Sequence, residues 1–376
     1  MIRVLHTADL HLGRAFTSWG EPAAELHRAD LRRTLERIGR IAVEQAAQLV
    51  LVAGDLFDVH HPTTDLVALA QSWLGNLATH RIPVVIIPGN HDSYWYQRSV
   101  YRETVFPENT HIFIEPICRQ PFSLRLGERD LSIYGIAHDH TRERQPLRSF
   151  RRRDSPGIHI GMLHATINPS PSLSTAERYL PLSSAELAAT GLDYIALGHI
   201  HRHHVYNEGR AGHASQPGSP EPLAIDEFGP RSVNLLRFDV DGPPRIERIE
   251  IGERRARRIE IDCTGLETAT IIEQLQRQSD PRLIAEVVLT GTPDDIINSD
   301  AISGAAAPMF FHLTLRDRTE VANAAFARAI EHEKTIRGAF VRTLRARAET
   351  ASADERATIE LALKRGLIAL HRRSVS

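Results

Sequence analysis

Five short apolar segments along the chain each end abruptly in polar residues. The clearest lies at 49–52, a run of Leu and Val typical of a strand that is buried on both faces of a sheet. Gly54, Asp55 and Asp58 follow it directly. The pattern predicts strands that carry chemically versatile residues at their carboxyl ends. The other four runs lead into Asp, Asn or His in the same way and lie at 4–5, 82–87, 158–163 and 194–197.

Helical periodicity fills the gaps between the first three runs. Apolar residues recur at i, i+4, i+7 and i+11 from Leu31 to Ala42, and a second stripe extends from Leu66 to Leu77. Alternating strands and helices predict a mainly parallel sheet with right-handed crossovers. Because the carboxyl ends of parallel strands lie at one edge of a sheet, the polar residues that follow the strands are expected to converge.

The pattern divides the chain into three predicted parts. Strand-like segments between 112 and 134 indicate a shift toward antiparallel pairing, and two later strands close a first domain at 1–252. The basic run that starts at Glu253 fits both a solvated linker and a phosphate-facing groove. A small α+β domain is expected at 253–318. A helical tail at 319–376 carries two amphipathic stripes, which either fold onto the body or dock on a partner.

Composition narrows the class of protein. With 376 residues, the chain is long enough for roughly two to three domains. A net charge of −2 excludes a chain that binds nucleic acid through its overall charge, so DNA contact would require a local basic surface. Two cysteines indicate no disulfide framework and favour a reducing, cytoplasmic location. No apolar run reaches the roughly 18 residues of a membrane span, so no membrane association is expected.

The residues after the five runs are typical metal ligands. They combine carboxylate, imidazole and amide groups without a thiolate, a set that suits Mn, Fe or Zn and argues against a calcium site made only of oxygen ligands. Two divalent cations are therefore expected, with Asp55 bridging them. A single one of these histidines could be explained as a structural residue. Seven donors that all lie at strand ends cannot be explained in that way. The remaining donors are assigned as Asp9, His11 and His201 for one cation and Asn90, His164 and His199 for the other.

Such a site predicts phosphodiester hydrolysis. Water held between two cations loses a proton near neutral pH, and the resulting hydroxide would attack phosphorus in line. His91 is assigned to neither cation, so it is the candidate to protonate or hydrogen-bond the leaving oxygen. Asp58 is expected to orient His91, since a carboxylate partner fixes the imidazole tautomer. Asp92 fits equally well as the cap of a helix after Asn90.

The five motifs together resemble the calcineurin-like metallophosphoesterase superfamily, whose series is DxH, GDxxD, GNHD or GNHE, an isolated His, and GHxH. The resemblance covers about the first 220 residues. It implies an α/β fold, a four-layer α/β/β/α sandwich with a binuclear metal site, followed by a small α+β capping domain and a helical C-terminal tail. In this sequence the motifs begin at Asp9, Gly54, Gly89, His164 and Gly198.

Three longer stretches resemble the DNA-repair nuclease branch of that superfamily, which contains SbcD, Mre-type and YhaO-like proteins. They are HTADLHLGR at 6–14, GDLFDVHHP at 54–62 and QPGSPEP at 216–222. The resemblance implies manganese as the metal, with Fe, Zn or Mg as alternatives. It also implies a homodimer, exonuclease or endonuclease action on DNA ends in double-strand break repair, and a helical tail that engages an SbcC-like or Rad-type ATPase. Some relatives have His where Asp58 stands.

Two other functions remain open at this point. A phosphodiesterase of small or cyclic nucleotides would use the same metals without a DNA groove, and would not shorten duplex DNA. A non-catalytic DNA-end-binding subunit would lack metal ligands, and none is missing here. The basic stretch Arg142 to Arg153 fits a solvated loop or a phosphate-contacting surface, and His138 and His140 beside it have no assigned role.

Overall fold

The computed structural model describes residues 1–139, 147–168, 180–239, 242–293, 297–319 and 330–372. By its internal contacts the chain divides into two compact units, Met1–Arg255 and Ala256–Ser376. The division lies close to the expected boundary at 252/253, and the three-domain scheme itself stays a prediction. Among the described residues, no helix is both long and apolar enough to cross a membrane.

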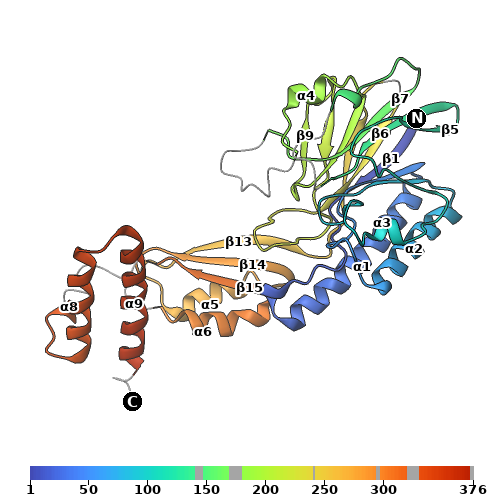
Figure 1. The fold of residues 1–376 in the computed structure, drawn as a ribbon. Helices are drawn as coiled ribbons and strands as arrows, with labels where there is room; N and C mark the ends of the chain where they lie inside the picture. Colours follow the sequence, from blue (N-terminus) through green and yellow to red (C-terminus); the bar gives the residue numbers. More distant parts are fainter. Residues whose placement is uncertain (140–146, 169–179, 240–241, 294–296, 320–329, 373–376) are drawn as a thin grey trace. The chain divides into compact units, whose positions relative to one another are not determined.

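The first unit contains two six-stranded sheets (Figure 1). In the first sheet β1 to β4 are parallel neighbours, as the alternation of strands and helices predicts. Two antiparallel strands extend it beyond β1. In spatial order, this sheet consists of β12 (Arg245–Glu250), β11 (Ser232–Phe238), β1 (Ile2–Thr7), β2 (Leu49–Ala53), β3 (Val84–Ile87) and β4 (Thr110–Ile112).

The second sheet is also mainly parallel. Only the hairpin of its first two strands and its last pair are antiparallel, so the shift expected between 112 and 134 is confined to that hairpin. The strands that follow the hairpin pair in parallel. In spatial order, the sheet consists of β5 (Phe122–Leu126), β6 (Arg129–Ile136), β7 (Ile158–His164), β8 (Tyr194–Gly198), β10 (Ala214–Gln216) and β9 (His204–Tyr206).

Alternating side chains build the layers of this unit. Val4, Leu51 and Ile87 of the first sheet pack between the sheets, against apolar residues of the second. Their neighbours along each strand are also buried and lie on the opposite face, which α1 (Glu21–Glu44) and α2 (Thr64–Thr79) cover (Figure 1). A one-residue slip of any strand would exchange these faces, so the register is strongly specified.

Smaller helices complete this architecture. Leu187 of α4 (Ser184–Ala188) packs on the outer face of the second sheet, against Leu163 and Ile195. The fold is therefore the predicted four-layer α/β/β/α sandwich. The remaining short segments of the unit are η1 (Thr17–Trp19), α3 (Val100–Glu103) and η2 (Leu147–Ser149).

The second unit has a three-stranded sheet with one face covered by two helices (Figure 1). Glu286 is buried within this sheet and pairs with Arg258 and Arg316, each at 2.7 Å. The basic run is therefore not simply a solvated linker, because Arg254 likewise pairs with buried Asp30 in the first unit, also at 2.7 Å. The elements are β13 (Arg255–Asp262), α5 (Thr268–Gln276), β14 (Asp280–Thr290), α6 (Ser299–Ala306), η4 (Ala307–Met309), β15 (Phe310–Asp317), α8 (Ile336–Glu349) and α9 (Ala353–Arg372).

Candidate metal centre

The predicted donors all lie at the carboxyl ends of central strands. The loops that follow β1 and β2 run side by side, since the backbone N–H groups of Asp9 and His11 donate to the carbonyls of Gly54 (3.1 Å) and Asp55 (3.0 Å). Donors from β3 and from the second sheet join them at the same rim. Asn90 and His91 follow β3, His164 is the last residue of β7, and His199 and His201 follow β8.

Asp55 lies between two groups of donors. Its Oδ2 is 3.5 Å from Nε2 of His11 and 3.2 Å from Nε2 of His164. His11 Nε2 is in turn 3.2 Å from Nε2 of His201. Ligand atoms bound at about 2.0–2.2 Å to one cation lie roughly 3 Å apart. These spacings are close enough for donors to bind a common cation, and Asp55 lies next to donors of both groups.

Asn90 and His199 complete the second group. Asn90 Oδ1 is 2.9 Å from His164 Nε2 and 3.1 Å from His199 Nδ1. The backbone N–H of His199 donates to Asp9 Oδ1 at 2.9 Å, while Oδ2 of the fully buried Asp9 has no hydrogen-bond partner among the described residues. A buried carboxylate oxygen without a partner is costly, and a bound cation would satisfy it. The donor set thus fits divalent cations.

Hydrogen bonds to the other ring nitrogen orient three of the imidazoles. Each Nδ1–H donates to an acceptor outside the cluster, which leaves a lone pair on Nε2, the atom that faces the other donors. This is the tautomer in which a neutral imidazole binds a metal. The three bonds run from His11 to Asp58 Oδ1 (2.9 Å), from His164 to the Ala53 carbonyl (3.0 Å) and from His201 to Glu227 Oε1 (2.8 Å).

Backbone strain is concentrated at the same residues. Asp9, His11, Asp55 and His199 have φ values of 54°, 46°, 50° and 94°, in the left-handed region that residues other than glycine rarely adopt. Each such residue costs on the order of 1–3 kcal/mol and persists only where its surroundings hold it. Four strained donors in one cluster indicate that the fold holds unfavourable backbone conformations in order to orient these side chains toward one another.

Two glycines allow the donors to approach one another. A Cβ at Gly89 would collide with the carboxylate and backbone nitrogen of Asp55, and a Cβ at Gly198 would collide with the Ala53 carbonyl. Any side chain at either position would therefore push the loops apart. This explains in steric terms why a glycine precedes Asn90 and His199.

The electrostatics of the cluster favour a cation. Burial raises the pKa of the Asp9 carboxyl. Burial also opposes ionisation of Asp55, but the charge of His164 and a hydrogen bond from it outweigh burial and lower the pKa of Asp55. In return, Asp55 overcomes the effect of burial on His164 and raises its pKa to about 9. A buried site that favours the protonated form of His164 has the negative potential that a divalent cation requires.

The structure differs from the sequence-based expectation at Asp58. Its carboxylate binds His11 and, at 3.2 Å, Arg14. His91 instead donates from Nδ1 to the backbone carbonyl of Asp58 (2.9 Å), and its Nδ1 is 3.9 Å from the Asp58 carboxylate. Asp58 thus orients His91 through its main chain and His11 through its side chain. Any role of either residue in the reaction stays a prediction.

The interpretation of Asp92 as a helix cap is wrong. Its buried carboxylate accepts hydrogen bonds from the backbone N–H of Gly89 (2.7 Å), from the backbone N–H of Phe57 (3.2 Å) and from the hydroxyl of Tyr101 (2.8 Å). It therefore fastens the loop after β3 to the loop after β2. Asp92 supports the donor cluster rather than capping a helix.

Sequence reasoning missed Glu227, which holds His201. Burial opposes its charged form, but the bond from His201 and the charge of Arg231 outweigh burial and lower the pKa of Glu227. Its Oε2 also accepts from the backbone N–H of Leu223 at 3.0 Å. Glu227 lies 26 positions from His201 and follows a turn rather than a strand, so the pattern of donors at strand ends does not mark it.

The basic stretch and its neighbouring histidines are only partly described. His138 is buried, and its carbonyl accepts from Ser93 Oγ at 2.8 Å. Arg152 pairs with Asp193 at 2.6 Å, whereas Arg148 and Arg151 are exposed. The positions 140–146, which include His140, Arg142 and Arg144, lie outside the described residues.

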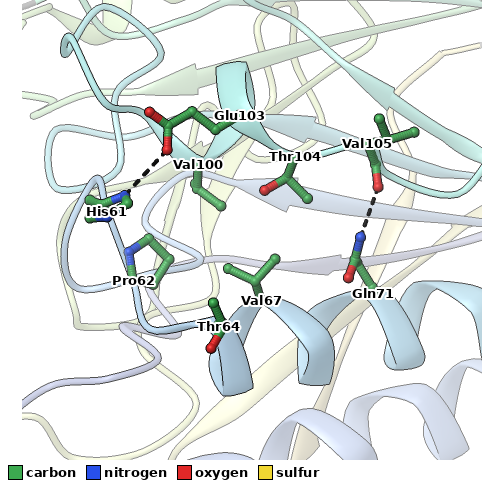
Figure 2. A pocket seen from close by; sticks show the side chains of 9 residues that line it. All are labelled: His61, Pro62, Thr64, Val67, Gln71, Val100, Glu103, Thr104 and Val105. Atoms are coloured by element: carbon green, nitrogen blue, oxygen red, sulfur yellow. Dashed lines mark hydrogen bonds and ion pairs between the residues drawn. The ribbon is translucent and has the colours of Figure 1, made fainter.

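A separate pocket of about 410 Å³ lies between α2 and the segment around α3 (Figure 2). Its polar contacts are the pair of His61 and Glu103, 3.6 Å apart, and a 2.9 Å hydrogen bond from Gln71 to the Val105 carbonyl. None of the nine residues that line it is a predicted donor. This pocket is therefore not part of the candidate metal centre.

A four-layer sandwich whose central strands deliver carboxylate, imidazole and amide donors to one rim defines a metal-dependent phosphoester hydrolase. Residues 2–203 match the family model described as calcineurin-like phosphoesterase. The chain belongs to this family, as its motifs predict.

Relatives with known names agree with the predicted branch. The uncharacterized metallophosphoesterase YhaO of Bacillus subtilis is 30% identical over 239 residues, which are 62% of this chain and 56% of that protein. The DNA double-strand break repair protein Mre11 of Sulfolobus acidocaldarius is 26% identical over 307 residues, 77% of this chain and 75% of the relative. A subunit of the nuclease SbcCD of Rhodobacter capsulatus is 26% identical over 287 residues, 65% of this chain and 68% of the relative. This chain thus spans little more than half the length of YhaO.

Proposed function

We propose that this protein hydrolyses phosphodiester bonds at DNA ends with two divalent cations, and that it acts in double-strand break repair. The observation that carries the proposal is the arrangement of donors on both sides of Asp55. The names of the Mre11 and SbcCD relatives support DNA as the substrate. Manganese is the proposed metal, and Fe, Zn and Mg are alternatives compatible with oxygen and nitrogen donors.

The proposed ligand sets follow the contacts of the donors. Asp55 would be shared by two cations, which together would supply an activated water and neutralise charge on the phosphoryl oxygens. Two triads of proposed donors have ligand atoms close enough together to hold a metal ion, Asp9 with His11 and His201, and Asp9 with Asp55 and His164. One cation would be held by Asp9, His11 and His201, and the other by Asn90, His164 and His199.

His91 is the proposed proton donor to the leaving oxygen. Its side chain is 39% exposed, so a bound phosphodiester could reach it, and its bond to the Asp58 carbonyl fixes the ring. The ring of His11 packs edge-on against it with centroids 4.7 Å apart, which keeps His91 beside the metal ligands. Asp58 acts as the positioning residue for both imidazoles. General acid assistance of this kind contributes typically 10²–10⁴-fold in rate.

Partners are proposed from the relatives and from charge. One relative is named as a subunit of a nuclease, which supports an SbcC-like or Rad-type ATPase as partner, with the segment 319–376 as the contact. The exposed apolar side chains Ile336 (79%) and Leu361 (50%) on α8 and α9 are available for such a contact. A net charge of −2 gives little attraction to DNA, so a homodimer or a partner would supply affinity.

The direct test is digestion of end-labelled duplex and single-stranded DNA in the presence and absence of manganese. The proposal predicts metal-dependent shortening that Asp55→Ala abolishes, with Glu128→Ala in the exposed β5–β6 turn as the control. Hydrolysis of bis(p-nitrophenyl) phosphate or cyclic nucleotides without any cleavage of DNA would instead identify a small-nucleotide phosphodiesterase. Binding of DNA ends without hydrolysis of any ester would contradict the enzymatic proposal.

A further inference from the structure

A pocket of about 340 Å³ adjoins the candidate metal centre on the side of Asp58. Residues 14–19 form one wall and residues 223–225 the other. Asp58 lines this pocket and also binds His11, so a single side chain separates the pocket from a proposed metal ligand.

Both walls of the pocket are hydrogen-bonded to residues that orient proposed metal ligands. Arg14 donates from Nη1 to the Asp58 carboxylate and from Nε to the Leu223 carbonyl, each at 3.2 Å. The backbone N–H of Leu223 donates to Glu227 at 3.0 Å, and Glu227 holds His201. The pocket is thus connected to two ligands of the same proposed cation, and its distance from that cation is fixed by the fold.

An aromatic cluster makes the first wall rigid. Phe16 has a φ of 54°, an unfavourable conformation for a bulky residue. Its ring packs against Trp19 and His27 with centroid separations of 4.9 and 4.6 Å. His27 Nε2 donates to the Pro222 carbonyl at 2.7 Å, which ties this wall to the other. The cavity is therefore preformed, and a ligand would enter it at little cost in ordering.

Apart from the Asp58 carboxylate, which pairs with Arg14, the lining of the pocket is suited to a phosphate carried on a small organic group. A guanidinium presents five N–H donors in a planar fork that matches phosphate. Within the described part of the chain, the hydrogen bonds of Arg14 use only Nε and Nη1, and its side chain is 31% exposed. Thr17 and Ser18 add exposed hydroxyls, and Ala224 and Ile225 add a small apolar surface for a sugar or base.

We propose that this pocket is a nucleotide subsite, which binds the nucleoside monophosphate unit next to the scissile phosphodiester with its phosphate on Arg14. The inference rests on the proposed function for the identity of the substrate, although the binding of a mononucleotide can be measured without catalysis. Occupation of the pocket by the end nucleotide favours release of mononucleotides. The free mononucleotide should also compete with DNA for the site.

The test is titration of the full-length chain, kept metal-free with EDTA, by isothermal calorimetry. The probes are the 5′- and 3′-monophosphates of deoxyadenosine, deoxyadenosine itself and inorganic phosphate. At least one mononucleotide should bind about 10-fold or more tightly than deoxyadenosine. Arg14→Gln should weaken that binding by about 10- to 100-fold. Arg125→Gln, which removes an exposed arginine of β5 that pairs with Asp130 of β6, should leave that binding unchanged.

A second variant guards against a folding defect in Arg14→Gln. Ala15 is exposed on the pocket wall, so Ala15→Glu places a carboxylate near Arg14 without emptying the core. It should weaken mononucleotide binding by a similar factor while the melting temperature stays unchanged. Failure of both mononucleotides to bind, or binding that neither variant weakens, would overturn the subsite.

The outcomes separate the subsite from the proposed function. If the wild type digests DNA with manganese but mononucleotide binding does not depend on Arg14 or Ala15, the subsite is wrong and the nuclease proposal survives. If mononucleotides bind as expected but no DNA is cleaved, the subsite stands and the nuclease proposal fails.

Discussion

At position 227, one carboxylate connects the pocket wall to a proposed ligand. Glu227→Gln keeps the size of the side chain but removes the charge that accepts from His201. We expect the affinity for one of the two cations to fall by about 10- to 100-fold, because the loss of a partner that orients a ligand typically costs that much. Equilibrium dialysis with manganese measures this affinity. The matched control is Glu247→Gln, an exposed partner of Arg237, and unchanged affinity for both cations in Glu227→Gln would refute the assigned role.

His91→Asn separates catalysis from metal binding. The variant should lower kcat by about 10²–10⁴-fold, since only the proton donor to the leaving oxygen is lost. Metal content, measured by inductively coupled plasma mass spectrometry, should remain near that of the wild type. His61→Asn, which changes an exposed histidine in the pocket of Figure 2, is the control. Loss of both metals from His91→Asn would show that His91 is a ligand instead.

At this scale, sequence reasoning identifies side chains better than it identifies their partners. Asp9, Asp55 and His199 are marked by the apolar strands that precede them. Glu227, which accepts the hydrogen bond from His201, is not marked in this way, because it comes close to His201 only through tertiary folding. The same limit explains Asp58, whose side chain is expected at His91 but binds His11. A sequence gives the position of a carboxylate along the chain but not the direction in which its oxygens point.

Among the elements, the turn after β3 requires glycine at position 89. In Gly89→Ala the new Cβ would meet Asp55, and the backbone there cannot give way. We expect a loss of about 1–3 kcal/mol in the free energy of unfolding, together with weaker manganese binding. Gly75→Ala in α2 is the control, because its Cβ meets nothing within 4 Å and should stabilise the helix by about 0.5–1 kcal/mol. Urea unfolding measures both, and equal effects would contradict the steric account.

The strands that could be predicted carry a recognisable hydrophobic pattern. A run such as Leu49–Ala53 is buried on both faces and carries an unambiguous signal. β9 and β10 carry no such signal because each has three residues and includes polar side chains, so their pairing depends on neighbouring strands. For α1, the helix begins at Glu21, ahead of the apolar stripe, with Pro22 in its first turn. Hydrophobic periodicity reports only the part of a helix that faces the core.

For the whole molecule, cation binding should stabilise the first unit. Binding to the native state alone adds about 2.7 kcal/mol at 100 times Kd, which corresponds to a rise of about 5 °C or more in the melting temperature. Differential scanning calorimetry with manganese should show this rise, with calcium as the control ion because it prefers oxygen ligands. Asp55→Ala should lose the rise. An equal rise in wild type and Asp55→Ala would place the cations elsewhere.

Donors separated by up to 192 positions, from Asp9 to His201, are proposed to enclose two cations with Asp55 between them. Anomalous diffraction from crystals soaked in manganese tests this most directly. Two peaks are expected, one beside His11 and His201 and one beside Asn90, His164 and His199, with Asp55 contacting both. A single peak away from Asp55, or no peak among these residues, would contradict the proposal.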